Sequence, residues 1–148
     1  MLVHRKLFGF DERSYVNVED FTIELTAHLK KIYDSKSRIR IIQEVEKGAM
    51  LHGKITLSFG LILSELLTNS FKYAFPDHDN PQITIRVETM NNEIRFVYAD
   101  NGAGMELNKP LERISMGVSL VHDLARQMNG KLQVSNQNGL RYKFIIPV

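Results

Sequence analysis

The chain has 148 residues, of which 43% are hydrophobic and 24% are charged, and its net charge at pH 7 is +2. This composition predicts one soluble globular domain with a substantial core and excludes a disordered or fibrous chain. The small net charge gives no reason to expect nucleic acid as a partner. The chain has no cysteine, which excludes disulfides and thiolate zinc sites and favours the cytoplasm. No apolar run approaches the roughly 20 residues that cross a membrane, so we expect no membrane contact by this segment.

The spacing of apolar residues predicts helices and strands in a definite order. Asn17 is a typical N-cap for the first helix, and Pro76 forbids continuation of the second. The pairs Asn91-Asn92 and Asn138-Gly139 tolerate the positive φ of tight hairpins. We expect helices over 18–34, 54–75 and 117–129, and strands over 38–46, 82–90, 93–100, 131–137 and 140–148.

This order of elements predicts the fold class. Three amphipathic helices alternate with one strand and then two hairpins, so most strand pairs are antiparallel and one face of the sheet is left for the helices. The result is a two-layer α/β sandwich with a mixed, mostly antiparallel sheet and three helices on one face. No repeat or linker interrupts the chain.

The second helix carries an unusual polar stripe in the stretch LSELLTNSFKYAF. Glu65, Asn69 and Lys72 follow one another at spacings of four and three, so an α-helix places them on one face. The leucines, with Ser70 and Phe71, lie on the packing face. The stripe alone is also compatible with an ordinary amphipathic helix whose polar side chains are solvated.

The stretch DNGAGM follows the strand 93–100 directly. The carboxylate of Asp100 at the strand end, followed by Gly102 and Gly104, suggests backbone that bends closely around a ligand, because glycine has no Cβ to obstruct the approach. The alternative is a plain loop, since Asp, Asn and Gly are also common turn residues.

The start of the last helix, in the stretch ISMGVS, contains Ser115, Gly117 and Ser119. Free amide groups and the positive end of the helix dipole favour an anion such as a phosphate at this position. Ser and Gly are also ordinary helix-start residues, so this motif alone decides nothing.

Together the three stretches resemble the motifs of the GHKL ATPases, the superfamily that includes histidine-kinase catalytic domains. The N box corresponds to residues 65–75, the first glycine box to 100–105 and the second to 115–120. The likeness runs from about His4 to the C-terminus and is closest to sensor kinases of the second HisKA type and to the related HWE kinases. It implies the Bergerat ATP-binding fold.

The resemblance also implies roles for individual residues. Asn69 would ligate Mg²⁺ that bridges the ATP phosphates, with Glu65 one turn earlier near the metal, and these two are the expected catalytic residues. Asp100 would accept a hydrogen bond from the adenine amino group. Lys72 would add charge near the phosphates, although a solvated lysine is the alternative. The remaining expected nucleotide-binding residues are Gly102, Gly104, Met105, Ser115, Gly117, Val118 and Ser119.

The implied function is phosphoryl transfer from ATP to a histidine on a separate dimerisation domain, with a response regulator downstream. Residues 1–15 would be the remnant of the helix preceding the catalytic domain, which would span 16–148. Ser119 stands where the second glycine box usually has glycine, which keeps a non-catalytic nucleotide-binding interaction module open as an alternative. A serine kinase of the anti-sigma-factor type is the other alternative.

Overall fold

The computed structural model describes residues 14–103, 116–136 and 138–148. One layer is a five-stranded sheet in the order β2-β4-β5-β7-β6. The strands are β2 (Arg40–Val45), β4 (Gln82–Met90), β5 (Glu93–Asp100), β6 (Lys131–Asn136) and β7 (Leu140–Pro147). Only β2 and β4 pair in parallel, whereas the other neighbours are antiparallel. The predicted mixed, mostly antiparallel sheet is confirmed.

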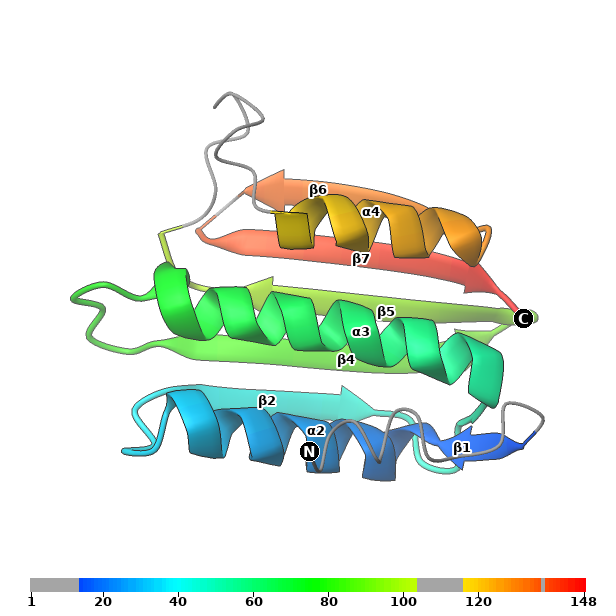
Figure 1. Cartoon of the computed structure of the whole chain (residues 1–148), viewed down its shortest axis with the longest axis horizontal. Helices are drawn as coiled ribbons and strands as arrows, with labels where there is room; N and C mark the ends of the chain where they lie inside the picture. The colour runs from blue at the N-terminus through cyan, green and yellow to red at the C-terminus, as the bar shows by residue number, and fades with distance from the viewer. Residues whose placement is uncertain (1–13, 104–115, 137) are drawn as a thin grey trace.

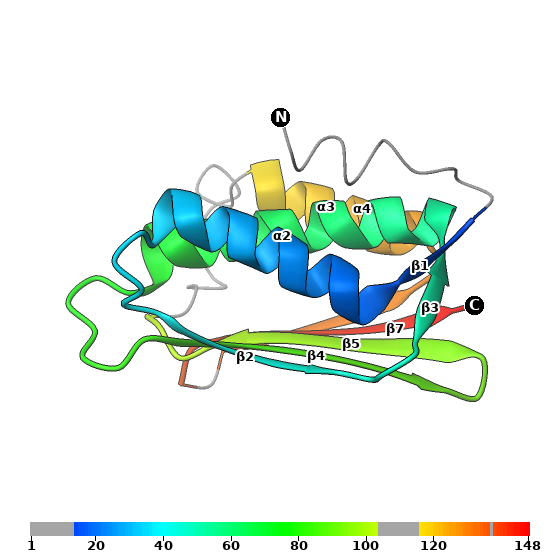
Figure 2. The same cartoon turned by 90° about the horizontal axis from the view of Figure 1, so that it is seen from below.

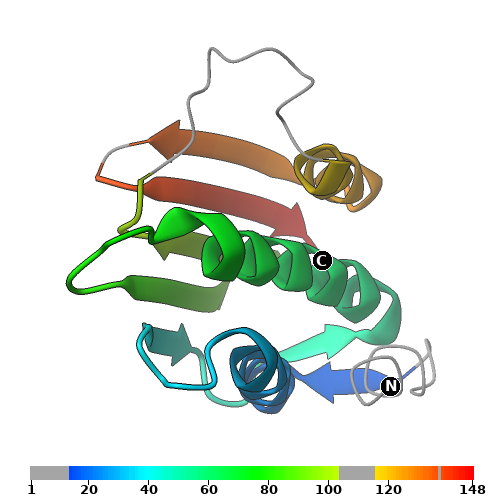
Figure 3. The same cartoon turned by 60° about the vertical axis from the view of Figure 1, so that its left-hand side comes forward.

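The second layer consists of three helices that lie side by side on one face of the sheet (Figures 1–3). They are α2 (Val18–Tyr33), α3 (Gly53–Asn69) and α4 (Met116–Gln127), with α3 between the other two. Asn17 caps α2 as predicted, because its Oδ1 accepts a hydrogen bond of 3.0 Å from the Asp20 amide. The predicted two-layer α/β sandwich is confirmed.

The hairpin turns also agree with the sequence. Asn91 and Asn92 have φ of 52° and 61°, and Asn138 and Gly139 have φ of 54° and 115°. The structure adds a small antiparallel sheet that the sequence pattern did not indicate, made by β1 (Tyr15–Asn17) and β3 (Met50–His52). Each of these strands has three residues, which is too short for an alternating pattern to be recognised.

The second predicted helix differs from expectation in its last turn. The α-helix ends at Asn69 and continues as a π-helical turn, η1 (Ser70–Ala74). Two groups from outside the helix lie at its carbonyls: the Tyr98 hydroxyl oxygen is 3.0 Å from the Leu66 carbonyl oxygen, and the Ala103 amide donates a hydrogen bond to the Ala74 carbonyl. Short π-helical segments are frequent at functional sites.

The core lies between the two layers and is built from the inward-facing residues of the sheet and the packing faces of the helices. Its largest fully buried side chains are Tyr98, Tyr142, Phe59, Phe96, Phe144, Ile62, Leu63, Leu67, Ile83, Ile85, Ile94 and Ile146. In the described parts of the chain, no helix combines the length and the apolar character needed to cross a membrane.

Candidate nucleotide site

The C-terminal end of α3 and the C-terminal end of β5 meet at one side of the molecule, on the left in Figure 1. The contact is direct, because the Ser70 hydroxyl donates a hydrogen bond of 2.9 Å to Asp100 Oδ2. Ser70 is the residue after Asn69 of the predicted N box, and Asp100 begins the predicted first glycine box. Two motifs that are thirty residues apart in the sequence therefore share one site.

Asp100 is a buried carboxylate held by donors from three parts of the chain. Its exposed fraction is 8%. Besides the bond from Ser70, its Oδ1 accepts hydrogen bonds from the Gly102 amide at 3.0 Å and from the Leu140 amide at 3.3 Å. Backbone donors of this kind stabilise a carboxylate that is withdrawn from water.

Two buried tyrosines lie behind the carboxylate on the inner face of the sheet, where Tyr98 of β5 pairs with Tyr142 of β7. The Tyr98 hydroxyl oxygen lies 2.7 Å from Ser70 Oγ. Burial raises the pKa of Tyr98 well above 10, the Ser70 hydrogen bond opposes this shift, and the negative charge of Asp100 adds to it. Burial, and then the charge of Asp100, raises the pKa of Tyr142 to about 12. Both hydroxyls therefore keep their protons at neutral pH.

Gly102 lies against the end of η1. A Cβ at this position would be 2.2 Å from the Ala74 carbonyl oxygen, a distance at which no side chain fits. The next amide, that of Ala103, donates a hydrogen bond of 2.8 Å to the same carbonyl. Glycine at position 102 thus allows the segment after β5 to pack directly on the end of the helix.

A histidine fixes the loop that follows η1. His78 Nδ1 accepts a hydrogen bond from the Asn80 amide at 3.1 Å, so the proton of the neutral ring is on Nε2, which lies 2.8 Å from the Asn101 carbonyl oxygen. The Asn101 side chain bonds in turn to the Gln82 amide and to the Asn80 carbonyl. This network holds Asn101, the residue that directly follows Asp100, against the loop after η1.

The predicted site residues at the end of the N-box helix differ in how far they are buried. Glu65 and Asn69 are half-buried in the last two turns of α3, whereas Lys72 is exposed on η1. The Lys72 ammonium lies 5.7 Å from the centroid of the Tyr33 ring. The prediction that the α-helix continues beyond Asn69 is wrong, because Ser70–Ala74 form the π-helical turn η1. That Lys72 shares a face with Glu65 and Asn69 stays a prediction.

The second glycine box is only partly described. Gly117, Val118 and Ser119 lie in the first turns of α4 by their backbone, and the Ser119 side chain is exposed. Gly104, Met105 and Ser115 lie outside the described residues. Their proposed roles stay predictions.

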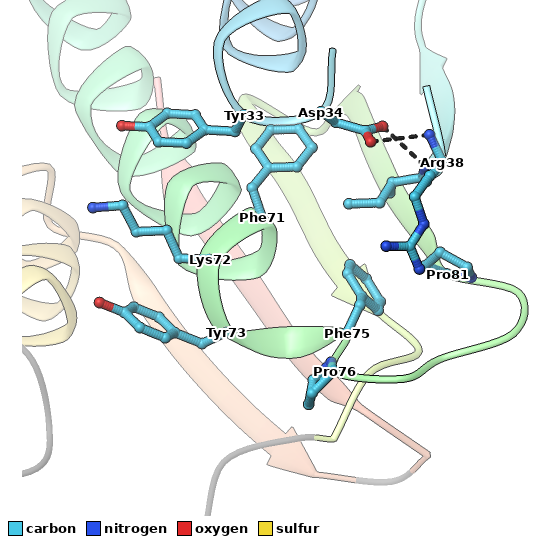
Figure 4. A pocket seen from close by; sticks show the side chains of 10 residues that line it. Tyr33, Asp34, Arg38, Phe71, Lys72, Tyr73, Phe75, Pro76 and Pro81 are labelled. Carbon is cyan, nitrogen blue, oxygen red and sulfur yellow. Dashed lines mark hydrogen bonds between the residues drawn. The ribbon is translucent and has the colours of Figure 1, made fainter. Parts of the chain in front are cut away.

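A cavity of about 420 Å³ opens between the end of α2 and η1 (Figure 4). Its walls include Tyr33 and Phe71, whose rings stack at 6.1 Å between centroids, and Arg38 on the opposite side. Neither Asn69 nor Asp100 lines it. The cavity is therefore distinct from the Ser70–Asp100 contact, although it lies next to it.

Sequence patterns did not indicate the hydrogen bonds that Ser70 makes with Asp100 and with Tyr98, because Ser70 and Tyr98 both have the positions of core side chains. The signal that the sequence offered was a hydroxyl at a core position in each element. Ser70 lies at the end of the N-box helix, and Tyr98 lies two residues before Asp100. A polar group in a core position needs a hydrogen-bond partner, and these two find each other.

Sequence comparison supplies the family. The profile of the histidine kinase-, DNA gyrase B- and HSP90-like ATPases matches residues 54–148. The chain belongs to this family. Membership confirms the superfamily predicted from the three motifs and implies that the domain binds ATP.

Individual relatives agree with this assignment. The sensor histidine kinase ComP of Bacillus subtilis (strain 168) is 27% identical over 88 residues, which are 59% of this chain and 11% of ComP. The chain thus spans only a small part of that curated relative.

Solved structures show the same fold. The histidine kinase domain of the blue-light activated histidine kinase from Erythrobacter litoralis EL346 has a TM-score of 0.84 at 18% identity, over 99% of this chain and 71% of that one. The catalytic domain of the histidine kinase ThkA has a TM-score of 0.74 at 20% identity, over 90% of this chain and 94% of that one. The predicted likeness to histidine-kinase catalytic domains is confirmed.

Proposed function

We propose that this ATPase-family domain is the ATP-binding catalytic domain of a sensor histidine kinase, which transfers the γ-phosphoryl group of ATP to a histidine on a separate helical dimerisation domain. The observation that carries the proposal is the Ser70–Asp100 hydrogen bond of 2.9 Å. It joins the end of the N-box helix to the start of the first glycine box in a fold shared with histidine-kinase catalytic domains.

The carboxylate of Asp100 suits the adenine end of the nucleotide. It is 8% exposed and is held by three protein donors, so its position is fixed before any ligand arrives. An acceptor oxygen at this point favours a purine with an amino group over one with a carbonyl. A hydrogen bond to a charged group contributes about 1.5–3 kcal/mol, or roughly ten- to a hundredfold in affinity.

The end of α3 suits the phosphate end. Glu65 and Asn69 stand one turn apart and are half-buried, and both have side-chain oxygens. Mg²⁺ prefers such hard donors and keeps several waters and phosphate oxygens as its other ligands, so Asn69 with Glu65 nearby fits it. When bound, the metal would neutralise phosphate charge, which is the main requirement of phosphoryl transfer.

The proposed partner is a histidine-bearing helical hairpin, and the proposed recipient further on is a response regulator. The test supplies the chain with Mg-ATP and a histidine-bearing hairpin, and measures phosphate on the hairpin. We expect Asn69→Ala to abolish transfer while the circular dichroism spectrum stays unchanged. Thr68→Ala is the matched control, because Thr68 is the adjacent half-buried polar residue of α3, and it should transfer normally.

The chemical stability of the product separates the alternatives. Phosphohistidine is labile to acid, whereas phosphoserine on a serine-bearing antagonist protein is not. Transfer to serine alone would favour the serine kinase, and ATP binding with no transfer to either acceptor would favour the non-catalytic module. Transfer by Asn69→Ala at the rate of the unmodified chain would refute the role of Asn69.

A further inference from the structure

A buried chain of hydroxyls leads to the carboxylate that the proposed function assigns to adenine. The Tyr98 hydroxyl lies 2.7 Å from Ser70 Oγ, and Ser70 Oγ lies 2.9 Å from Asp100 Oδ2. Tyr98 is completely buried, and Ser70 is 3% exposed. Water therefore has little access to either hydroxyl, and their protons are distributed among these three side chains and one carbonyl.

The negative charge of Asp100, at the end of this series of hydrogen bonds, determines which hydroxyl donates to which. The Tyr98 hydroxyl has one proton, and burial and the charge of Asp100 raise its pKa, so it acts as a donor. Its other acceptor, the Leu66 carbonyl at 3.0 Å, also accepts from the Ser70 amide within the helix. An ionised Asp100 attracts donors, which favours the arrangement in which Tyr98 donates to Ser70 and Ser70 donates to Asp100.

The acceptor positions of Asp100 can then be counted. A carboxylate offers about four lone-pair positions, two on each oxygen. The Gly102 and Leu140 amides occupy Oδ1, and Ser70 occupies one position on Oδ2. Among residues 14–103, 116–136 and 138–148, no further hydrogen bond to Oδ2 is found, so with respect to these residues one acceptor position on Oδ2 is left.

We propose that Ser70, oriented by Tyr98, is the positioning residue that determines purine specificity, because it leaves Asp100 a single acceptor position for the 6-amino group. This inference rests on the proposed nucleotide site. The remaining position accepts one N–H and has nothing to donate to a 6-oxo group. Without the Ser70 hydroxyl, Oδ2 has two open positions and the carboxylate loses a bond that fixes its plane, so the selection should weaken.

The test compares nucleotides whose purines differ in the substituent at position 6; in the 6-oxo purine N1 also carries a proton. Isothermal titration measures the affinity of the whole chain for ATP, which has an amino group, for purine riboside triphosphate, which has hydrogen there, and for inosine triphosphate, which has a carbonyl. We expect the unmodified chain to prefer ATP over both analogues by at least about tenfold. Ser70→Ala should lower the affinity for ATP about tenfold and change the affinity for purine riboside triphosphate less than about twofold.

Thr56→Val is the matched control. Like Ser70, Thr56 is a buried residue with a hydroxyl, with an exposed fraction of 1%, but it lies at the N-terminal end of α3 and bonds to the carbonyls of Leu51 and His52 there. Its substitution should leave all three affinities unchanged, even if the melting temperature falls. A general loss of stability is thereby distinguished from a loss of selection.

Tyr98→Phe keeps the ring and removes the first donor of the chain. We expect it to reduce the preference for ATP about threefold. Because Tyr98 acts through Ser70, the double variant with Ser70→Ala should have the same preference as Ser70→Ala alone. If Ser70→Ala proves too unstable for titration, Tyr98→Phe alone tests the inference, because it must still shift the preference, and an unchanged preference would refute the role of this pair.

The outcomes separate this inference from the function on which it rests. If the unmodified chain bound none of the three nucleotides, the proposed nucleotide site itself would fail. If it preferred ATP and Ser70→Ala kept that preference, or weakened all three nucleotides equally, the role of Ser70 would be refuted. Loss of the preference in Ser70→Ala, with Thr56→Val unchanged, would support it.

Discussion

The two ends of α3 use a buried hydroxyl in different ways. Near the N-terminal end, Thr56 donates to the His52 carbonyl at 3.0 Å, only four residues away in the sequence. Just beyond the C-terminal end, Ser70 donates to Asp100, thirty residues away. The first hydroxyl serves the start of its own helix, whereas the second connects the helix to the end of a strand.

The difference distinguishes a local hydrogen bond of a buried hydroxyl from a tertiary one in this fold. A hydroxyl that bonds within its own turn stabilises local structure, and its removal should affect stability alone. A hydroxyl that bonds to a distant carboxylate fixes the position of an acidic group at the sheet end. The N-terminal end of α3, where the hydroxyl bonds locally, is regular α-helix. The C-terminal end, beyond which the hydroxyl bonds to a distant strand, continues as a π-helical turn.

The largest effect is expected from Gly102→Ala at the second end. The added Cβ would lie 2.2 Å from the Ala74 carbonyl oxygen, so the segment after β5 must move away from η1. We expect a loss of at least about 3 kcal/mol in the free energy of unfolding, measured by urea denaturation, together with loss of ATP binding.

Gly48→Ala is the control for Gly102→Ala, because nothing lies within 4 Å of a Cβ at position 48 and only the φ of 79° is strained. Its cost should be about 1 kcal/mol. A cost for Gly102→Ala no larger than the control's would mean that this contact with η1 is not tight.

A smaller effect is expected from Tyr142→Phe at alkaline pH. The pKa of Tyr142 is raised to about 12 in the folded chain, from 10.0, so between these values the folded chain keeps a proton that the unfolded chain releases. Stability is therefore complete below pH 10 and falls as the pH rises towards 12. Tyr142→Phe should reduce this fall by up to about 2 kcal/mol, measured by urea denaturation between about pH 9 and about pH 11.5. Tyr15→Phe, at a position that is 65% exposed, should leave the profile unchanged, and an unchanged profile in Tyr142→Phe would contradict the assigned cause.

Thr56→Val sharpens the comparison at the first end. It removes a buried donor from the start of α3 and leaves a carbonyl without that bond, so we expect about 1 kcal/mol of destabilisation. Thermal unfolding measures the change. ATP binding should remain at the level of the unmodified chain, and a clear loss of affinity would mean that the two ends of α3 are coupled.

His52→Ala should have the smallest effect. The ring Nδ1 of His52 accepts a hydrogen bond of 3.4 Å from the Lys54 amide at an exposed helix start. This bond is long, so its removal should cost no more than about 0.5 kcal/mol. A urea-denaturation midpoint lowered well beyond that would show that the cap contributes more than its geometry suggests.

The sequence predicted most of the fold because its signals are local. The strands β4 and β5 match the expected ranges 82–90 and 93–100, since alternation and the paired asparagines define both strands and the turn. The strands β1 and β3 were missed because three residues are too few for an alternating pattern to be recognised. The π-helical turn η1 was missed because apolar spacing over five residues does not distinguish it from an α-helical turn.

The candidate site divides in the same way. Sequence alone determined which motifs are present, because the residue types and spacings around Asn69, Asp100 and Gly117 identify the family without coordinates. Only the tertiary structure decided that Ser70 and Tyr98 hold Asp100 in place, and that Gly102 packs on Ala74. Periodicity places a side chain on a face of its own element, but the partner of a buried polar group is set by the packing of helix on sheet.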